Sequence, residues 1–506
     1  MNVATLLEDQ AKALPGKAAI ICNGKKTTFQ QLDETVNRFA NYFAKKGISS
    51  GDRVLVFILP SAELTATMFG LFKMGAVPVV IDPGMGVKNL LKAIEEVSPQ
   101  AVIGISKAFV LSALFRKSFR TARIKLKSET LMEKSSGEPG AFTARDMGVD
   151  EPAAILFTSG GTGTPKGVVY THKIFTAQTA LLQKMFSLTP DDIGYACFFL
   201  FTFFSLGLGM SSYFPSVDMS KAARAKPETL VREITESGAS FVSGSPAFWM
   251  RTAEYCLARG ITLPRVKSLV MFGAPVQVAT HEKWRAILPN GTTYSPYGAT
   301  ESLPVSNISG DYILKHTAKE TDAGAGTCVG KTVDTVEAGI INSDEIVVSG
   351  DVVTREYYNN EKATRESKLF KDGKMWHIIG DVGRIDEEGR IWFYGRKAHV
   401  VDIPGARMYP IPCEAVFNRH PGIKRCALIG PSVGGSVIPS LVIERNDGGT
   451  KMTEAFLKEL HEIRDKHEHT RPIEKFYLKK TFPVDIRHNI KIDRIALRAW
   501  AEGRSN

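Results

Sequence analysis

The sequence lacks the paired cysteines that mark disulfide-stabilised or zinc-binding proteins. Its six cysteines are widely separated and never form a CxxC pair. That distribution predicts neither a disulfide framework nor a metal-binding knuckle, and it favours a reducing compartment, so we expect the cytoplasm. The cysteines are Cys22, Cys197, Cys256, Cys328, Cys413 and Cys426.

The chain also lacks a nucleic-acid-binding signature and an export signal. Its net charge is +11, but the 64 Lys and Arg residues are spread along the whole sequence instead of forming one run. No zinc-finger spacing, RNA-binding motif or basic arm is present, so no nucleic-acid partner is expected. The N-terminal stretch MNVATLLEDQAKAL contains acids where a signal peptide needs a basic start and an apolar run, so no export is predicted.

One long uncharged run does occur, from Ile193 to Val217. It is long enough to cross a bilayer. A span there would place the glycine-rich loop near residue 160 and the basic segment near residue 490 on opposite sides of a membrane, where one site could not use both. The run is also interrupted by Gly207, Gly209 and Ser211. We therefore expect buried structure lining an apolar pocket, and no transmembrane span.

The length and the residue pattern predict a multidomain α/β protein. A chain of 506 residues with 43% hydrophobic content exceeds what one core usually supports. Strands alternate with helices over most of the chain, which predicts mainly parallel sheets covered by helices. From Glu345 the strands are shorter and separated by turns, which indicates a β-rich subdomain. We place the domain boundary near Lys397, with an N-terminal domain at residues 1–396 and a small, mobile α+β domain at 397–506.

The strongest local pattern is the stretch LFTSGGTGTPKG, an apolar strand that runs into glycines and hydroxyls and ends in a lysine. Such a loop lets backbone N–H groups approach phosphate oxygens and supplies hydroxyl donors and a cation. It is not a Walker loop, because Gly167 follows the lysine where that motif needs Ser or Thr. The predicted phosphate-binding residues are Thr158, Ser159, Gly160, Gly161, Thr162, Gly163 and Lys166.

This loop resembles the TSGTTGxPKG signature of the acyl-adenylate-forming superfamily, which includes acyl-CoA synthetases, luciferases and peptide-synthetase adenylation domains. The resemblance extends from Thr28 to the C-terminal tail, and it implies ATP and Mg²⁺ as cofactors. The stretch YGATE is similar to the family's YGxTE. It implies that Tyr297 and Gly298 lie against adenine, that Thr300 meets phosphate, and that Glu301 is a catalytic residue that holds Mg²⁺.

Further motifs follow in the order of that family. Gly273, Ala274 and Pro275 resemble the backbone segment beside adenine, Asp381 the ribose-binding aspartate, and Arg396 an arginine that also reaches ribose. Lys397 falls at the family's hinge position. Lys491, in the stretch RHNIKI, resembles the tail lysine that enters the N-terminal domain during adenylation and acts there in catalysis.

Two departures narrow the choice within the family. Gly161 replaces the usual hydroxyl residue, and Thr202 stands where many acyl-CoA synthetases have a histidine. Several stretches resemble the β-lactone synthetases of bacterial olefin biosynthesis, and two residues within them, Cys328 and His399, gain interest only through that resemblance. These stretches are SPYGATESLPVS, GAGTCVG, VVTREYY, WFYGRKAH and RHNIKIDR.

The resemblance implies activation of a fatty or 3-hydroxy fatty acid as its acyl adenylate, followed by ring closure to a β-lactone. It also implies association with other enzymes of the olefin pathway. One alternative is a fatty acyl-CoA synthetase, and another is a non-catalytic scaffold that binds ATP or an acyl ligand. The presence of Lys166, Glu301 and Lys491 argues against the scaffold.

Overall fold

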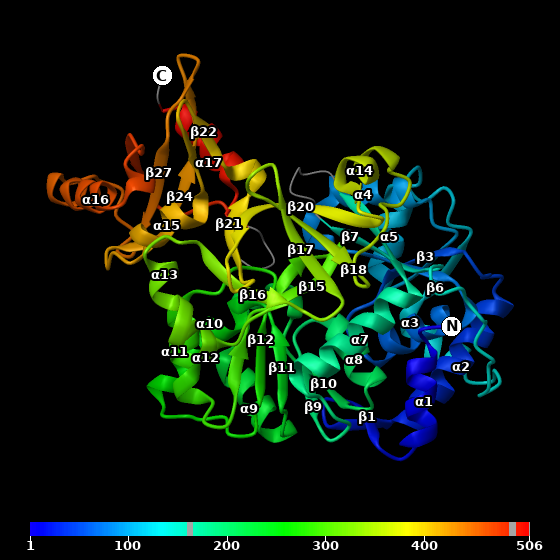
Figure 1. The fold of residues 1–506 in the computed structure, drawn as a ribbon. Coiled ribbons are helices and arrows are strands. Elements are labelled where there is room, and N and C mark those ends of the chain that lie inside the picture. Colours follow the sequence, from blue (N-terminus) through cyan, green and yellow to red (C-terminus); the bar gives the residue numbers. More distant parts are fainter. Residues whose placement is uncertain (159–164, 485–491, 505–506) are drawn as a thin grey trace.

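The computed structural model describes residues 1–158, 165–484 and 492–504 (Figure 1). Two mainly parallel sheets with covering helices, a β-rich sheet and a small C-terminal α+β unit follow one another along the chain. The predicted fold class is therefore confirmed, and Figure 1 shows the C-terminal unit, α15 to α17, at one end of the molecule.

The first sheet has the strand order β6-β5-β3-β4-β7-β8. Its strands run parallel except β8, which returns antiparallel to β7. The carboxyl ends of β3, β4, β5 and β7 therefore meet at one edge, where ligands bind in open α/β sheets. The elements of this part are β3 (Arg53–Phe57), α3 (Ala62–Met74), β4 (Val77–Ile81), α4 (Val87–Val97), β5 (Ala101–Gly104), α5 (Ser106–Leu114), β6 (Ile124–Lys127), α6 (Leu131–Lys134), β7 (Pro152–Thr158), β8 (Lys166–Thr171) and α7 (His172–Phe186).

The second sheet has the order β13-β12-β11-β9-β10-β1-β2 and takes two strands from the N-terminus, an insertion that no local pattern predicts. Only β1 and β2 pair antiparallel. Its elements are α1 (Thr5–Ala13), β1 (Ala18–Cys22), β2 (Lys25–Thr28), α2 (Phe29–Lys45), β9 (Ile193–Ala196), α8 (Phe199–Gly207), β10 (Ser211–Phe214), α9 (Pro227–Ser237), β11 (Phe241–Gly244), α10 (Pro246–Ala258), β12 (Ser268–Met271), α11 (Val278–Ile287) and β13 (Thr292–Tyr294).

The third sheet is antiparallel and forms the β-rich subdomain, which begins at Tyr297 and not at the predicted Glu345. Its last strand ends at Arg396, and separate hydrophobic clusters begin at Val401. The elements of the subdomain are β14 (Tyr297–Ala299), β15 (Ser302–Asn307), α12 (Gly310–Tyr312), α13 (Ala318–Asp322), β16 (Thr327–Thr332), β17 (Val336–Ile341), β18 (Glu345–Gly350), α14 (Glu361–Ser367), β19 (Lys368–Lys371), β20 (Lys374–Ile385) and β21 (Ile391–Arg396). The C-terminal unit contains β22 (Val401–Ile403), β23 (Ala406–Met408), α15 (Pro410–Asn418), β24 (Ile423–Ile429), β25 (Ser432–Val433), β26 (Ser436–Val437), β27 (Ser440–Arg445), α16 (Glu454–Lys466), β28 (Lys475–Leu478) and α17 (Arg494–Glu502).

Local sequence explains where several helices begin and end. Thr28 caps α2 in a reciprocal capping box with Gln31, as the sequence predicts. Ser61 accepts the Leu64 N–H at the start of α3, and Gly75 ends that helix in the left-handed conformation, with φ 72°.

The uncharged run folds into β9, α8 and β10, and not into one long helix. Phe203 of α8 stacks on Phe69 with ring centroids 4.8 Å apart, and Phe201 stacks on Phe272 at 4.9 Å. The expectation of buried structure is confirmed. In the described part of the chain, no helix has both the length and the apolar character that a membrane crossing requires.

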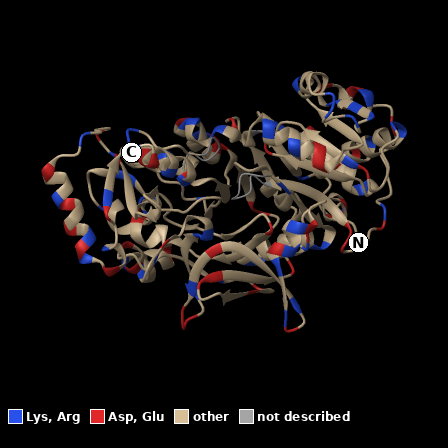
Figure 2. Ribbon diagram, turned by 90° about the horizontal axis from the view of Figure 1, so that it is seen from above, with Lys and Arg blue, Asp and Glu red and all other residues tan. Residues whose placement is uncertain are grey.

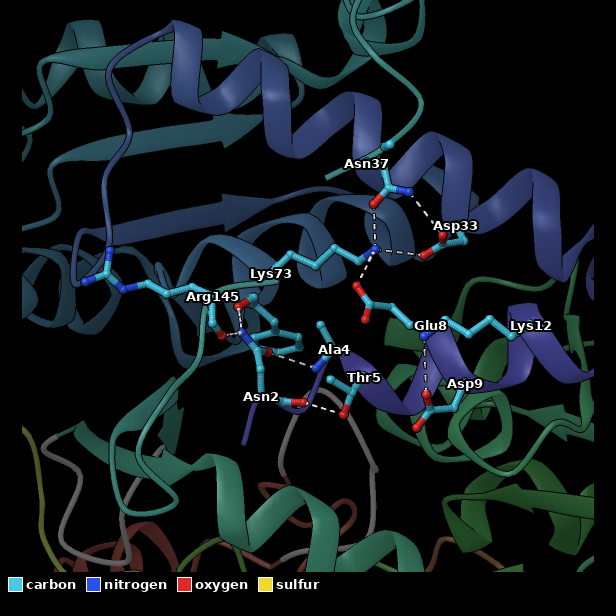
Figure 3. A network of polar contacts seen from close by, with 12 residues as sticks. Asn2, Ala4, Thr5, Glu8, Asp9, Lys12, Asp33, Asn37, Lys73 and Arg145 are labelled. Atoms are coloured by element: carbon cyan, nitrogen blue, oxygen red, sulfur yellow. Dashed lines mark hydrogen bonds and ion pairs between the residues drawn. The ribbon is translucent and has the colours of Figure 1, made fainter. Parts of the chain in front are cut away.

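A buried ion cluster ties α1, α2 and α3 together (Figure 3). The Lys73 side chain is 1% exposed, and its Nζ lies 2.7 Å from Glu8 Oε1 and 2.8 Å from Asp33 Oδ1. It also donates a hydrogen bond to Asn37 Oδ1. Two carboxylates and an amide therefore compensate the cost of burying this ammonium group.

Candidate active site

The predicted phosphate loop begins where β7 ends, at the carboxyl edge of the first sheet. Thr158 pairs with Lys166 across β7 and β8, so the two ends of the loop lie side by side. Ser159, Gly160, Gly161, Thr162 and Gly163 lie outside the described residues.

Lys166 and Glu301 both contact Tyr357, Lys166 at the ring and Glu301 at the hydroxyl group. The Lys166 ammonium lies 4.9 Å from the centroid of the Tyr357 ring, a cation–π contact. The Tyr357 hydroxyl donates to Glu301 Oε1 at 2.7 Å. Burial, with a further contribution from Glu301, raises the pKa of Tyr357 well above its ordinary value, so the hydroxyl remains a donor. Tyr357 therefore holds a cation and a carboxylate from different segments beside each other.

Backbone pairing fixes Tyr357 in this place. Val168 of β8 forms an antiparallel bridge with Tyr357, and the Tyr358 N–H donates to Gly167 O at 2.7 Å. The segment that carries Tyr357 therefore extends the hydrogen bonding of β8 directly after the phosphate loop.

A second lysine, Lys368, is linked to Glu301 through the backbone of Thr354. Lys368 donates to Thr354 O, and Thr354 in turn donates its N–H to Glu301 O at 2.8 Å. Lys368 Nζ also lies 3.2 Å from Nδ1 of the buried His377. Burial lowers the pKa of Lys368 to about 8, although the negative charge of Glu301 acts in the opposite direction.

The pKa of His377 is lowered by burial and by several cations that lie near it. Its pKa is lowered to about 3, first by burial, and then by the positive charges of Lys368, Lys166 and Arg396. Lys166, Lys368 and Arg396, from three different segments, therefore lie close enough for their charges to act on His377. A concentration of cations suits a polyanionic ligand such as a triphosphate.

Asp381 and Tyr297, two residues predicted to bind the nucleoside, are directly bonded. The Tyr297 hydroxyl donates to Asp381 Oδ2 at 2.7 Å, and Arg396 lies 3.1 Å from Asp381 Oδ1. Asp381 is 4% exposed. Burial and then Asp381 raise the pKa of Tyr297 well above its ordinary value, while Asp381 raises that of Arg396. A carboxylate has about four lone-pair sites and can accept from further hydroxyl groups, as ribose recognition requires.

Close backbone contacts surround Tyr297 and Thr300. A Cβ at Gly298 would lie 2.4 Å from Ser302 O, so only glycine fits there. The carbonyl of Thr300 accepts from the Tyr170 hydroxyl at 2.6 Å. Gly273, with φ 86°, opens the segment Gly273, Ala274 and Pro275 shortly after β12. Most of the described nucleotide-binding candidates thus lie at or near the ends of strands, whereas Asp381 lies within β20.

The predicted hinge residue Lys397 contacts the β-rich subdomain. Its Nζ lies 2.8 Å from Glu345 Oε2, and the neighbouring Asp344 accepts from Tyr409 at 2.9 Å and pairs with Arg407 at 2.8 Å. These contacts join the C-terminal unit to the turn before β18. Lys491, predicted to act in catalysis, lies outside the described residues. Its neighbour Ile492 forms a bridge with Val484.

Three further residues that the sequence singled out are buried or partly buried among ordinary structural contacts. Thr202 is buried in α8, where its hydroxyl accepts from Ser212 Oγ at 3.2 Å. Cys328 is buried in β16, and burial raises the pKa of its thiol. Burial, followed by the charges of Arg494 and Arg396, lowers the pKa of His399 to about 4.

Sequence reasoning missed Tyr357 and Lys368 as members of this site. Tyr357 lies within VVTREYY, one of the stretches that carried the resemblance, so a pointer to it was present. Nothing in the sequence marks Lys368, which reaches Glu301 only through Thr354. Pairing between distant segments brings both residues to the site.

The fold, together with the sequence likenesses that follow, defines an ATP-dependent, AMP-forming ligase that activates carboxylic acids. The chain belongs to the AMP-binding enzyme family, whose pattern matches residues 7–358. It is 36% identical to an olefin beta-lactone synthetase from Xanthomonas campestris, over 99% of this chain and 97% of that protein.

Two further proteins are similar to this chain. A long-chain-fatty-acid–CoA ligase from Mycobacterium tuberculosis is 25% identical over 85% of this chain and 85% of that protein. The crystal structure of ATP-bound MatB from Rhodopseudomonas palustris superposes with a TM-score of 0.84 at 23% identity and covers 100% of both chains. This last likeness shows the fold alone.

Proposed function

We propose that the protein converts a 3-hydroxy fatty acid into a β-lactone at the expense of ATP, releasing pyrophosphate and AMP. The observation that carries the adenylation half is the convergence of Lys166, Lys368 and Arg396 with the carboxylates Glu301 and Asp381. The lactone half rests on the 36% identity to an olefin beta-lactone synthetase over nearly the whole chain.

In the first step, a carboxylate oxygen of the substrate attacks the α-phosphorus of ATP, and pyrophosphate leaves. Lys166 and the phosphate loop hold the phosphates, Asp381 and Arg396 hold the ribose, and Tyr297 lies against adenine. Lys491 stabilises the charge that develops on phosphate, which is the kind of interaction that accelerates a reaction most. The small domain carries Lys491 and turns about Lys397.

Glu301 would supply a ligand to Mg²⁺, together with phosphate oxygens, in the manner usual for this ion. The ion would neutralise part of the phosphate charge. Tyr357 fits this assignment because its hydroxyl orients the carboxylate of Glu301 beside Lys166.

In the second step, the 3-hydroxyl oxygen attacks the carbonyl carbon of its own acyl adenylate. The hydroxyl loses its proton, the bond between carbonyl carbon and AMP oxygen breaks, and a four-membered ring closes. Ring strain opposes this step. Holding nucleophile and carbonyl together can contribute ~7–11 kcal/mol against the barrier, and AMP is a good leaving group.

The alkyl chain requires an apolar site, and α8 supplies apolar surface. Phe198, Phe199 and Leu200 at its start are only partly buried, and Phe198 meets Phe272 with ring centroids 5.6 Å apart. Each buried methylene contributes about 0.8 kcal/mol, so a long chain would be held mainly by this term.

The second candidate is a fatty acyl-CoA synthetase, which the mycobacterial relative favours. To separate the two, purified protein is given ATP, Mg²⁺ and a 2-alkyl-3-hydroxy fatty acid without coenzyme A. We expect AMP and a β-lactone by mass spectrometry. If a thioester forms when coenzyme A is added and the hydroxy acid yields no lactone, the lactone assignment is wrong and only adenylation stands.

A further inference from the structure

Positive charge is concentrated in one segment, contrary to the expectation that it is evenly spread. Residues 97–128 contain seven Lys and Arg residues and no Asp or Glu. They account for seven of the eleven net positive charges of the chain. Elsewhere Lys and Arg alternate with Asp and Glu over most of the ribbon (Figure 2). The seven residues are Lys107, Arg116, Lys117, Arg120, Arg123, Lys125 and Lys127.

All seven side chains are exposed, on α5, on the turns after it and on the edge strand β6. Among the residues that the structure describes, none of the seven has a carboxylate within ion-pair distance. Three acids flank the segment: burial raises the pKa of Glu96 to about 7, and Glu95 and Glu129 are engaged by neutral donors. Glu95 accepts from Ser118 Oγ and Glu129 from the Ser106 N–H, both at 2.7 Å. The positive field of this segment is therefore largely uncompensated.

The same helix exposes large apolar side chains at its C-terminal end. Val110 is 61% exposed, Leu114 72% and Phe115 37%. Val110 and Leu114 are four residues apart and lie on one face of α5. Ala108 and Ser112 of the same helix are buried. Exposed apolar side chains on a short helix that is followed directly by Arg116, Lys117 and Arg120 suit a segment that lies in a membrane interface.

We propose that residues 106–123, α5 and its following turns, form a peripheral binding surface for an anionic lipid bilayer. The cations meet the lipid headgroups, and Val110, Leu114 and Phe115 enter the boundary with the acyl chains. A nucleic acid would satisfy the cations but leave these apolar side chains in water. The choice of a bilayer also rests on the proposed function, because a long-chain acid substrate partitions into membranes.

The position of α5 keeps a bound bilayer away from the C-terminal unit. Figure 1 shows α5 beside α4, at the side away from the C-terminal unit that carries α15 to α17. Contact with a bilayer through α5 therefore does not restrict the turning of that unit.

Sedimentation of the full-length protein with vesicles tests the electrostatic part. We expect binding to vesicles of phosphatidylcholine with roughly one third phosphatidylglycerol, weakening with salt, and little binding to phosphatidylcholine alone. Each basic residue near the surface contributes about fivefold, so Arg116→Glu with Lys117→Glu and Arg120→Glu should lower partition by more than tenfold. The matched control changes the same net charge at exposed sites on other strands, Lys25→Glu with Lys26→Glu and Lys371→Glu, and should retain binding.

A second pair of variants tests the apolar part. Val110→Ser with Leu114→Ser should lower binding several-fold even at low salt. Ile495→Ser, at a position 67% exposed on α17, should not. The proposal is overturned if no vesicle is bound, if both charge variants lose binding equally, or if the serine pair changes nothing. It is also overturned if inorganic phosphate displaces the protein more than chloride does at the same ionic strength. None of these measurements needs ATP or an acid, so their failure is distinct from failure of lactone formation.

Discussion

The cluster around Lys73 and the cluster around Glu301 hold their charges in different ways. Lys73 is surrounded by Glu8, Asp33 and Asn37, so opposite charges compensate one another within the protein. Glu301 is held by the neutral hydroxyl of Tyr357, whose ring faces Lys166. The first arrangement ties three helices together. In the arrangement around Glu301, uncharged groups position the charged side chains. The electric field of these side chains therefore remains available to act on a charged ligand.

We therefore expect substitutions in the two clusters to show their effects in different assays. Loss of a charge that compensates another within the fold should lower stability and leave the kinetics of the folded enzyme intact. Loss of a charge that the proposed chemistry uses should lower the rate and leave the fold intact.

Lys491→Ala should lower the rate of adenylate formation by about 10²–10³-fold and leave ATP affinity within a few-fold, because this lysine acts on transition-state charge. Single-turnover formation of the adenylate gives the rate, and equilibrium titration gives the affinity. Lys475→Ala, at an exposed position on β28, is the control. Equal losses of rate and affinity would assign Lys491 to ground-state binding instead.

Lys73→Met should lower the free energy of unfolding by about 3 kcal/mol, because it leaves Glu8 and Asp33 without their cation. Urea unfolding measures this, and KM for ATP should not change. Lys12→Met removes a surface lysine 3.9 Å from Asp9 and should cost less than about 1 kcal/mol. A loss of turnover in folded Lys73→Met protein would contradict the separation of the two clusters.

Lys368→Met should change how stability depends on alkaline pH. The pKa of Lys368 is about 8 in the folded protein against an ordinary 10.5. Between these values the unfolded chain binds the extra proton, so stability rises with pH through this window. Relative to Lys368→Met, the unsubstituted protein should gain roughly 2 kcal/mol from pH 7 to pH 10. Parallel stability curves for the two proteins would show that Lys368 is not held in a desolvated site.

Tyr357→Phe should raise the Mg²⁺ concentration needed for half-maximal rate by about five- to tenfold, because Glu301 loses a donor that orients it while Lys166 keeps its ring. Tyr358→Phe is a matched control, since the Tyr358 ring packs against Arg53. An unchanged Mg²⁺ requirement would separate Tyr357 from the metal site.

The sequence predicted the parts of this structure that depend on local pattern. The start of α2 at Thr28 and the end of α3 at Gly75 follow from neighbouring residues, whereas the antiparallel subdomain begins at Tyr297, before the predicted change at Glu345. It did not predict that β1 and β2 join the second sheet, because strand partners far apart in sequence leave no local mark.

The candidate site likewise contains residues that the sequence predicted and contacts that it did not predict. Motifs named Glu301, Asp381, Tyr297 and Arg396, and the structure brings the last three into direct contact. The tie between Lys166 and Glu301 depends on Tyr357, which arrives through a bridge to β8, and the approach of Lys368 depends on β19 pairing with β20. Such contacts follow from tertiary pairing and not from spacing. The roles assigned to all these site residues, to the phosphate loop and to Lys491, and the domain boundary, stay predictions.

The fate of the carboxylate oxygens tests the central claim most directly. A 2-alkyl-3-hydroxy acid with both carboxylate oxygens replaced by ¹⁸O is turned over with ATP and Mg²⁺, and AMP and lactone are analysed by mass spectrometry. The account predicts one ¹⁸O in AMP and one in the lactone carbonyl, with the ring oxygen coming from the unlabelled hydroxyl. Unlabelled AMP together with a lactone that retains both ¹⁸O atoms would mean that the hydroxyl, and not the carboxylate, is activated, and would contradict acyl adenylate formation.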